Sequence, residues 1–243
     1  MIDVDENVTG ICVTYKYRDL IERAYDSIRI FHPDMKIIIV DGSNANDRTH
    51  NCYEYLDSIV CEKTKIYHMN YNVGHGRGLH YGIKKVNTPF VLTFDSDIIM
   101  TKSPLKEMLS MFEPDTYGVG YCEKTDLWGF DYGAIPSHMS KGWMKYLHPY
   151  FCLIQIKEYY KYDSMIHHGA PAVKAMLSIY KKGISDKVIK EFPGLGHSSG
   201  KGFSWTSAPR EFIQHDVGGF GGTGRRRIQE GLPHIEGSWE KVI

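Results

Sequence analysis

The stretch Asn72–Asp97, NVGHGRGLHYGIKKVNTPFVLTFDSD, constrains the fold of this chain more than any other part of the sequence. Its pattern predicts a loop, a short glycine-rich helix and then a buried strand. The helix is expected to end at Thr88, because the residue before a proline is pushed out of the helical region. The nearly continuous apolar run Phe90–Phe94 is typical of an inner strand that is covered on both faces. The stretch therefore predicts one helix–strand unit of a layered α/β domain.

Two aspartates follow this strand, with only Ser96 between them. Residues two apart in extended chain point the same way, so the carboxylates of Asp95 and Asp97 can face one spot. Ligands of open α/β sheets bind beyond the carboxyl ends of the strands. Because carboxylate oxygens suit a hard divalent cation, the pattern predicts a cation site at this edge.

Strand and helix alternate through the first hundred residues. Apolar runs predict strands at Val8–Thr14, Lys36–Val40 and Lys65–Met69, with amphipathic helices between them. This order predicts an α/β fold with a mostly parallel central sheet that is flanked by helices on both faces.

The regular alternation of strand and helix is less clear after the two aspartates. Further strands are expected at Tyr117–Cys122 and Tyr150–Ile156, and a helix is expected to open at Pro171. Residues 123–149 are aromatic and lack a clean period, which fits an acceptor-facing loop and equally fits rings that cover the sheet. From residue 193 onward glycine and serine are dense, and we expect a mobile tail that orders over a ligand.

Composition and charge narrow the class of protein. The 243 residues are 42% hydrophobic and carry equal numbers of acidic and basic side chains, so a single domain with a real core is expected and a general affinity for nucleic acid is not. No apolar run approaches the roughly 20 residues of a membrane-spanning helix. The acidic start MIDVDENVTG has no apolar signal region, and five cysteines without a CxxC pair read as reduced thiols. We therefore expect a cytoplasmic protein without membrane insertion.

The glycine-rich stretch also resembles a known family. The motif carrying the resemblance is an asparagine and spaced glycines before a hydrophobic strand that runs into Asp-x-Asp: Asn72, Gly74, Gly76, Gly78, His80, Gly82, Asp95 and Asp97. It resembles the nucleotide-sugar half of a GT-A glycosyltransferase of the family-two type, and the resemblance covers roughly residues 8–125. It implies a single GT-A (Rossmann-like) domain over residues 1–243. Within it, residues 8–100 would bind the nucleotide-sugar, 101–192 would face the acceptor, and 193–243 would form a C-terminal lid.

The resemblance also implies roles for donor-site residues. Asp41, at the end of the second strand, is expected to accept from a ring N–H of the nucleobase, which favours a UDP-sugar donor. Thr14 and Tyr15 would flank the base, with Tyr17 as a competing choice to Tyr15. The expected contacts of the diphosphate are Gly74, Arg77, Gly78, Arg225 and Arg226, the last two from the basic run at 225–227.

A bound cation is implied in the same way. Asp97 is expected to bind Mn²⁺ or Mg²⁺ directly, and Asp95 is expected to reach ribose or a metal-bound water as part of the same ligand set. His215 is expected to be the third protein ligand, because many metal-dependent members of this fold supply a histidine from the C-terminal segment. The cation would stabilise the charge that grows on the leaving diphosphate.

The acceptor side is less defined. Inverting members of the family place an acidic pair at the start of the helix that Pro171 opens, and this chain has histidines there instead. The candidates for the general base are Asp163, His167 and His168, whereas a retaining enzyme would need none. A glycan, a lipid-linked sugar, a protein or a modified nucleic-acid base could supply the acceptor hydroxyl. Nucleic acid is expected only as an acceptor.

The sequence as a whole predicts a metal-dependent hexosyl- or pentosyltransferase that uses a nucleoside diphosphate sugar, with Asp97, Asp163 and His168 as catalytic residues. Two alternatives remain. A sugar-phosphate nucleotidyltransferase would need a glycine-rich loop after the first strand, and the segment TYKYRD supplies none. A binding module that has lost catalysis would fit the missing acidic pair.

Overall fold

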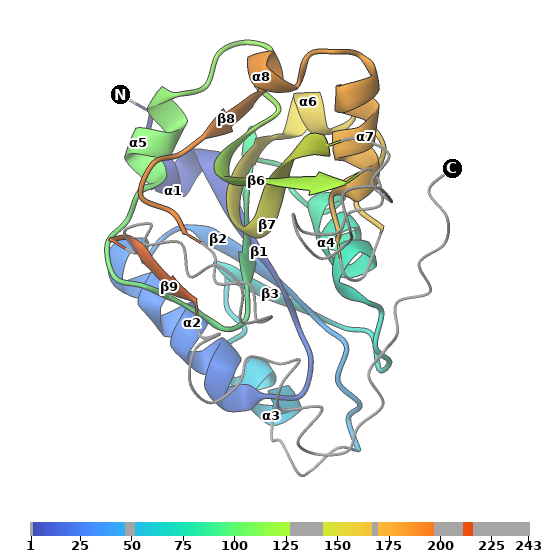
Figure 1. Ribbon diagram of the computed structural model, residues 1–243. Coiled ribbons are helices and arrows are strands. Elements are labelled where there is room, and N and C mark those ends of the chain that lie inside the picture. Colours follow the sequence, from blue (N-terminus) through green and yellow to red (C-terminus); the bar gives the residue numbers. More distant parts are fainter. Residues whose placement is uncertain (1, 47–51, 127–142, 167–169, 197–210, 216–243) are drawn as a thin grey trace.

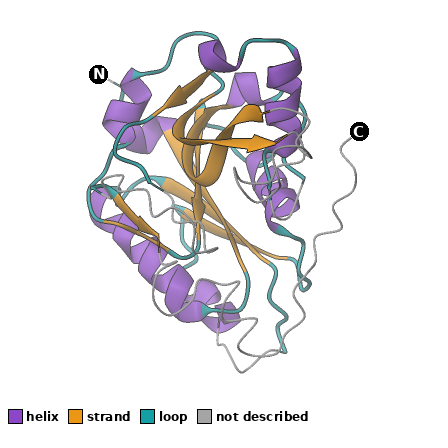
Figure 2. Cartoon of the chain, viewed as in Figure 1, coloured by secondary structure: helices purple, strands orange, loops and turns teal. Residues whose placement is uncertain are grey.

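The chain forms one seven-stranded sheet with helices on both of its faces (Figures 1 and 2). The computed structural model describes residues 2–46, 52–126, 143–166, 170–196 and 211–215. The strands lie side by side in the order β3-β2-β1-β4-β7-β6-β8, and β5 and β9 form a separate two-stranded sheet. Among the helices within these ranges, none combines the length and the apolar character that crossing a membrane requires.

The first four strands of the large sheet are parallel. They are β1 (Val8–Thr14), β2 (Lys36–Asp41), β3 (Thr64–His68) and β4 (Phe90–Asp95), and the pairs β1–β2, β1–β4 and β2–β3 all run in the same direction. The helices between them are α2 (Arg18–Phe31), α3 (Cys52–Ser58) and α4 (His75–Ile83). The predicted α/β fold with a mostly parallel central sheet is therefore confirmed.

Alternation along the inner strands builds a core on each face of the sheet. Ile37 and Ile39 of β2 pack in the cluster that contains α2 and α3, whereas Ile38 and Val40 pack in the cluster that contains α4. Successive residues of a strand point to opposite faces, so a strand covered on both sides must be apolar throughout. This is why the second strand reads as the unbroken run KIIIV.

Helix α4 lies unusually close to β1 because its facing positions are glycines. A Cβ atom at Gly78 would lie 2.8 Å from both Cγ1 and Cγ2 of Val13, and one at Gly82 would lie 2.8 Å from Cγ2 of Ile11. Real Cβ atoms essentially never come within 3.0 Å of such neighbours. Because Gly78 and Gly82 have no side chains, residues of β1 can pack directly against the backbone of α4 at these two positions.

The second half of the chain adds antiparallel strands at the β4 edge. β7 (Trp143–Gln155) pairs with β4 and with β6 (Gly118–Asp126), and β8 (Ile189–Glu191) runs parallel to β6. Both β6 and β7 are longer than predicted, because residues 123–126 and 143–149, from a stretch in which no strand was expected, are strand. Residues 127–142 lie outside the described ranges. The helices described in this half of the chain are α5 (Leu105–Ser110), α6 (Ile156–Tyr159), α7 (Val173–Lys181) and α8 (Ser185–Val188).

A short strand from the expected tail joins the domain. β9 (Ile213–His215) pairs antiparallel with β5 (Ile98–Met100), which follows the two aspartates directly. The backbone N–H of Thr101 also donates to the carbonyl of Phe212 (2.8 Å). Residues 211–215, which belong to the tail that is expected to order over a ligand, thus complete a two-stranded sheet with their backbone groups. Most of the other residues of the tail lie outside the described ranges.

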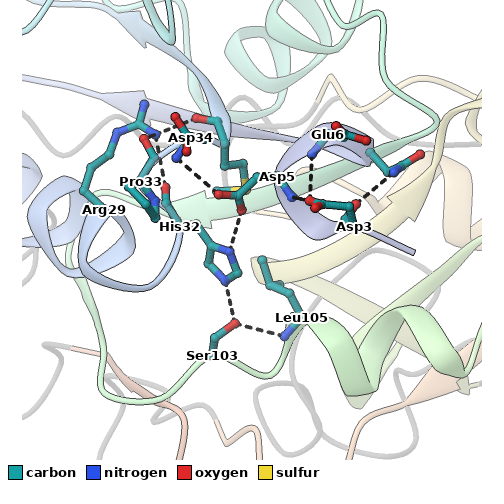
Figure 3. A network of polar contacts seen from close by, with 11 residues as sticks. Asp3, Asp5, Glu6, Arg29, His32, Pro33, Asp34, Ser103 and Leu105 are labelled. Atoms are coloured by element: carbon teal, nitrogen blue, oxygen red, sulfur yellow. Dashed lines mark hydrogen bonds and ion pairs between the residues drawn. The ribbon is translucent and has the colours of Figure 1, made fainter. Parts of the chain in front are cut away.

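A polar network around His32 ties three segments together at the end of the sheet remote from the aspartates (Figure 3). His32 follows α2; its Nδ1 lies 2.8 Å from a carboxylate oxygen of Asp5 in α1 (Val4–Asn7), and its Nε2 lies 2.6 Å from the hydroxyl of Ser103. The backbone N–H of Asp34 donates to the other oxygen of Asp5, and that of Leu105 donates to Ser103. Asp5 and Ser103 each also accept a hydrogen bond from a backbone N–H, so the network connects α1, the end of α2 and the start of α5.

Candidate active site

The strand ends bring the first set of predicted residues to one edge of the sheet. Thr14 and Asp41 are register partners at the ends of β1 and β2, and Val13 pairs with Asp95 at the end of β4. Parallel neighbours end at a common edge, so residues far apart in sequence meet there. Thr14, Asp41 and Asp95 therefore occupy three consecutive positions along this edge.

Asp41 is held in a fully buried hydrogen-bond network. The backbone N–H of Ser43 donates to its Oδ1 (2.9 Å), and Nδ1 of His68 donates to its Oδ2 (2.9 Å). The other ring nitrogen of His68 lies 3.2 Å from Asp57, and the ring of Tyr53 stacks on the imidazole with centroids 3.7 Å apart. Asp41 itself is 0% exposed. The structure thus gives Asp41 two fixed donors, which hold its carboxylate in one orientation.

Sequence reasoning missed His68, although the signal was present. His68 ends β3, and the register of the parallel pair β2–β3 places it opposite Asp41. A polar residue at the end of the third strand could have been assigned to the same edge. The tertiary contact is what turns that position into a partner of the carboxylate.

A tight turn follows β1 beside this network. Lys16 has a positive φ of 72°, and the backbone N–H of Tyr17 donates to the carbonyl of Tyr15 (3.0 Å). The N–H of Lys16 donates to the hydroxyl of Ser43 (2.8 Å), which joins the turn to the end of β2. The turn buries the Tyr17 ring and leaves Tyr15 partly exposed, so Tyr15 is the better placed of the two to meet a ligand.

The carboxylates of Asp95 and Asp97 both affect the pKa of one buried side chain, the thiol of Cys12. Burial raises the pKa of the Cys12 thiol well above its ordinary value, and the negative charges of Asp95 and then Asp97 raise it further. Both aspartates retain partly accessible side chains, whereas Ser96 between them is buried. Asp95 ends β4, and Ser96 and Asp97 form the turn that follows it.

The start of α4 reaches Asp95. Gly74, with φ 79°, precedes the helix, and its N–H donates to the side-chain oxygen of Asn72 (3.0 Å). The first helical residue, His75, then places its Nε2 3.3 Å from Oδ1 of Asp95. His75 is a second site residue that the sequence did not single out; its position directly after the turn glycine was the available signal.

The pairing of β5 with β9 places His215 beside the aspartates. Ile98, the residue after Asp97, is the register partner of His215. The backbone of the predicted third ligand therefore lies next to that of Asp97, although the two residues are more than a hundred positions apart. Carboxylate oxygens and an imidazole are donors that Mn²⁺ accepts, so the residues present fit such an ion. Within the described residues no group of three or more side chains of ligand type is already gathered.

Other predicted residues are not brought to this edge. Asp163 is exposed and lines a surface hollow together with side chains of α7 and the residue after it, among them Lys174, Lys181 and Lys182. Arg77 is exposed on α4, and the position of Gly78 faces Val13. His167, His168, Arg225 and Arg226 lie outside the described residues.

The β6–β7 hairpin forms a wall beside this edge of the sheet. β7 is antiparallel to β4, with Phe94 opposite Phe151, so the residues of β7 before Phe151 extend past the carboxyl end of β4. On this wall His148 lies 3.8 Å from a carboxylate oxygen of Glu123. Neither residue was predicted, because an aromatic stretch without a period gives no sign of a paired hairpin.

Comparisons with solved structures agree with this architecture. A mannosyltransferase from Pyrobaculum calidifontis, PcManGT, solved with GDP-Man and Mn²⁺, superposes with a TM-score of 0.53 at 11% identity, over 77% of this chain and 55% of that one. TarS from S. aureus aligns with a TM-score of 0.49 at 16% identity, over 76% of this chain and 35% of that one. At such identity the first likeness shows the fold alone, and the chain spans about half of the mannosyltransferase's length.

The sequence itself gives the family. No curated protein matches it. The profile of glycosyl transferase family 2 matches residues 11–173, which is more than half of the chain and includes the ends of β1, β2, β3 and β4. The protein therefore belongs to glycosyl transferase family 2.

Proposed function

We propose that this protein is a metal-dependent glycosyltransferase that moves a sugar from a nucleoside diphosphate, with uridine favoured, to an acceptor hydroxyl. The observation that carries the proposal is the common edge at which β1, β2 and β4 end, where Thr14 is the register partner of Asp41 and Val13 is that of Asp95. A nucleoside diphosphate sugar needs a base pocket, a site that tolerates its diphosphate charge and an open anomeric carbon. In this proposal, the edge would provide the base pocket and the diphosphate site next to each other.

The nucleobase would lie at the β1–β2 end of the edge. Tyr15 is partly exposed and can stack on a ring, while Asp41 supplies an acceptor for a ring N–H of uracil. Each oxygen of Asp41 already accepts one hydrogen bond and has a second lone pair. Because Asp41 is fully buried, base binding requires a covering group such as the Tyr71–Asn72 backbone, which lies close over Gly42, to move aside.

The diphosphate would lie at the β4 end. Asp95 and Asp97 would hold Mn²⁺ or Mg²⁺ with His215, and the ion would neutralise charge on the leaving diphosphate. Gly74 and Arg77 at the start of α4, together with Arg225 and Arg226, would contact phosphate oxygens. His75 keeps Asp95 oriented through their 3.3 Å contact. Residues 193–243 would close over the donor and exclude water.

The test is the release of nucleoside diphosphate from a panel of UDP-, TDP-, GDP- and CDP-sugars, with Mn²⁺ and with excess chelator. Asp97→Asn should reduce release by several orders of magnitude and leave the unfolding transition in place, because the amide keeps the shape and loses the charge. A matched control is Glu107→Gln on α5, which carries the same change on an exposed carboxylate elsewhere in the fold. Full activity in chelator would overturn metal dependence, and tighter binding of CDP than of UDP would count against the role of Asp41.

A further inference from the structure

Transfer by a single displacement needs a base beside the anomeric carbon, and the start of α7 does not offer a carboxylate. The described residues before α7 are Ala170, Pro171 and the N-cap Ala172. None of these side chains can accept a proton, and Asp163 lies on a surface hollow among lysines. Among the described residues, a base for such a transfer would have to come from another element that borders the same space.

The β6–β7 hairpin borders it. The hydroxyl of Thr93 in β4 donates to the carbonyl of Pro149 (2.8 Å), which fixes the middle of β7 against the last residues of β4. Gly120 pairs with Cys152 and Cys122 pairs with Leu147, so between these pairs β6 advances by two residues and β7 by five. The extra residues of this bulge include His148, and bulges re-aim side chains near active sites.

Glu123 and His148 face each other on this wall. Nε2 of His148 lies 3.8 Å from Oε1 of Glu123, a distance beyond a direct hydrogen bond and within ion-pair range. Their side chains are 16% and 19% exposed, so both are largely enclosed and still reachable. A carboxylate at such a position costs desolvation free energy that an amide would avoid.

Tyr146 connects Glu123 to the helix start where the family places its acidic pair. Tyr146 is the register partner of Glu123, and its hydroxyl accepts from the backbone N–H of Ala172 at the cap of α7 (3.3 Å). Burial raises the pKa of Tyr146 well above its ordinary value, and the charges of Glu123 and Asp95 add to the rise. Glu123 thus lies on the strand next to β7, opposite the tyrosine that contacts the α7 cap.

We propose that Glu123 is the general base of the transfer and that His148 positions its carboxylate. This inference rests on the proposed glycosyl transfer and adds the group that activates the acceptor. The acceptor oxygen bonds to the anomeric carbon while the bond from that carbon to the diphosphate oxygen breaks. The bonding electrons leave with the nucleoside diphosphate, and the proton of the acceptor hydroxyl ends on Glu123. A displacement of this kind inverts the anomeric configuration.

Water serves as the acceptor in the experiment, and the readout is UDP release from UDP-sugars with Mn²⁺. Glu123→Gln should slow release by on the order of 10²- to 10⁴-fold, the usual share of a general base, while calorimetric affinity for UDP with Mn²⁺ stays at the wild-type value. Glu123→Asp should retain part of the rate. Formate added to Glu123→Ala should restore release, which a merely structural carboxylate would not allow. His148→Ala should slow release less than Glu123→Gln does.

Glu191→Gln on the neighbouring strand β8 is the matched control, since it makes the same change at an exposed position opposite Gly120. It should release UDP at the wild-type rate. Wild-type turnover in Glu123→Gln, or no formate rescue of Glu123→Ala, overturns the inference. Loss of turnover in Asp163→Asn or His168→Ala with Glu123→Gln active moves the base to those residues. A wild-type protein that neither binds UDP nor releases it overturns the proposed function itself.

Discussion

His68 donates a 2.9 Å hydrogen bond to Asp41 across the ends of two neighbouring parallel strands. The contact fixes a carboxylate that has no exposed surface. A buried carboxylate keeps its charge only where donors replace water, so the imidazole is part of what makes Asp41 usable as an acceptor. The proposed base pocket therefore involves residues at the ends of three strands, β1, β2 and β3.

Replacing His68 should accordingly weaken both the fold and nucleotide binding. His68→Ala removes the donor to Asp41 and the ring that stacks on Tyr53, and we expect a loss of about 1–3 kcal/mol in the free energy of unfolding together with weaker UDP binding. His68→Asn is the control, because its amide can still donate to Asp41. Urea titration and calorimetry measure the two effects. Equal stability of His68→Ala and wild type would show that the hydrogen bond contributes nothing.

His215 should contribute to cation affinity through its position opposite Ile98. We expect His215→Ala to weaken Mn²⁺ binding in the presence of UDP by at least tenfold, while UDP affinity without metal stays unchanged. Gln214→Ala is the matched control, since Gln214 is the exposed residue that precedes His215 on the same short strand. Manganese titration followed by electron paramagnetic resonance distinguishes the two variants. Identical affinities would remove His215 from the ligand set.

Gly78 should tolerate no side chain while Val13 keeps both methyl groups. Gly78→Ala puts a Cβ 2.8 Å from each of them, and overpacking of this kind costs about 1–3 kcal/mol. Val13→Ala in the same chain should recover part of the loss, because it removes the two atoms in conflict. A double-mutant cycle by chemical unfolding gives the coupling. Additive losses would mean that α4 shifts away from β1 at little cost.

Cys61 should react first among the five cysteines with a thiol reagent. It is exposed, and its pKa is lowered, chiefly by the hydrogen bond from Thr64. Burial raises the pKa of Cys152 to about 12 and that of Cys122 to about 12. Since the thiolate is the reactive form, alkylation at Cys61 should begin at lower pH than at the other two and increase as pH rises through its pKa. Iodoacetamide labelling at several pH values, followed by peptide mapping, checks the order.

The sequence by itself determined the layered architecture and the row of acidic residues along its edge. Apolar runs such as Ile37–Val40 and the nearly continuous Phe90–Phe94 are typical of strands covered on both faces, and their alternation with amphipathic helices predicts a parallel sheet. Parallel strands end together, so a residue that closes a strand, such as Asp41 or Asp95, is assigned to one edge without any knowledge of packing. These are consequences of local periodicity and strand direction.

Only the tertiary structure decided which side chains meet at that edge. His68 and His75 became partners of the two carboxylates through strand register and the close approach of α4, and the Glu123–His148 pair arose from a hairpin bulge in a stretch without periodicity. The placement of His215 depends on pairing between β5 and β9, segments separated by most of the second half of the chain. Such contacts depend on register and packing between distant segments, which the local pattern of a sequence does not encode.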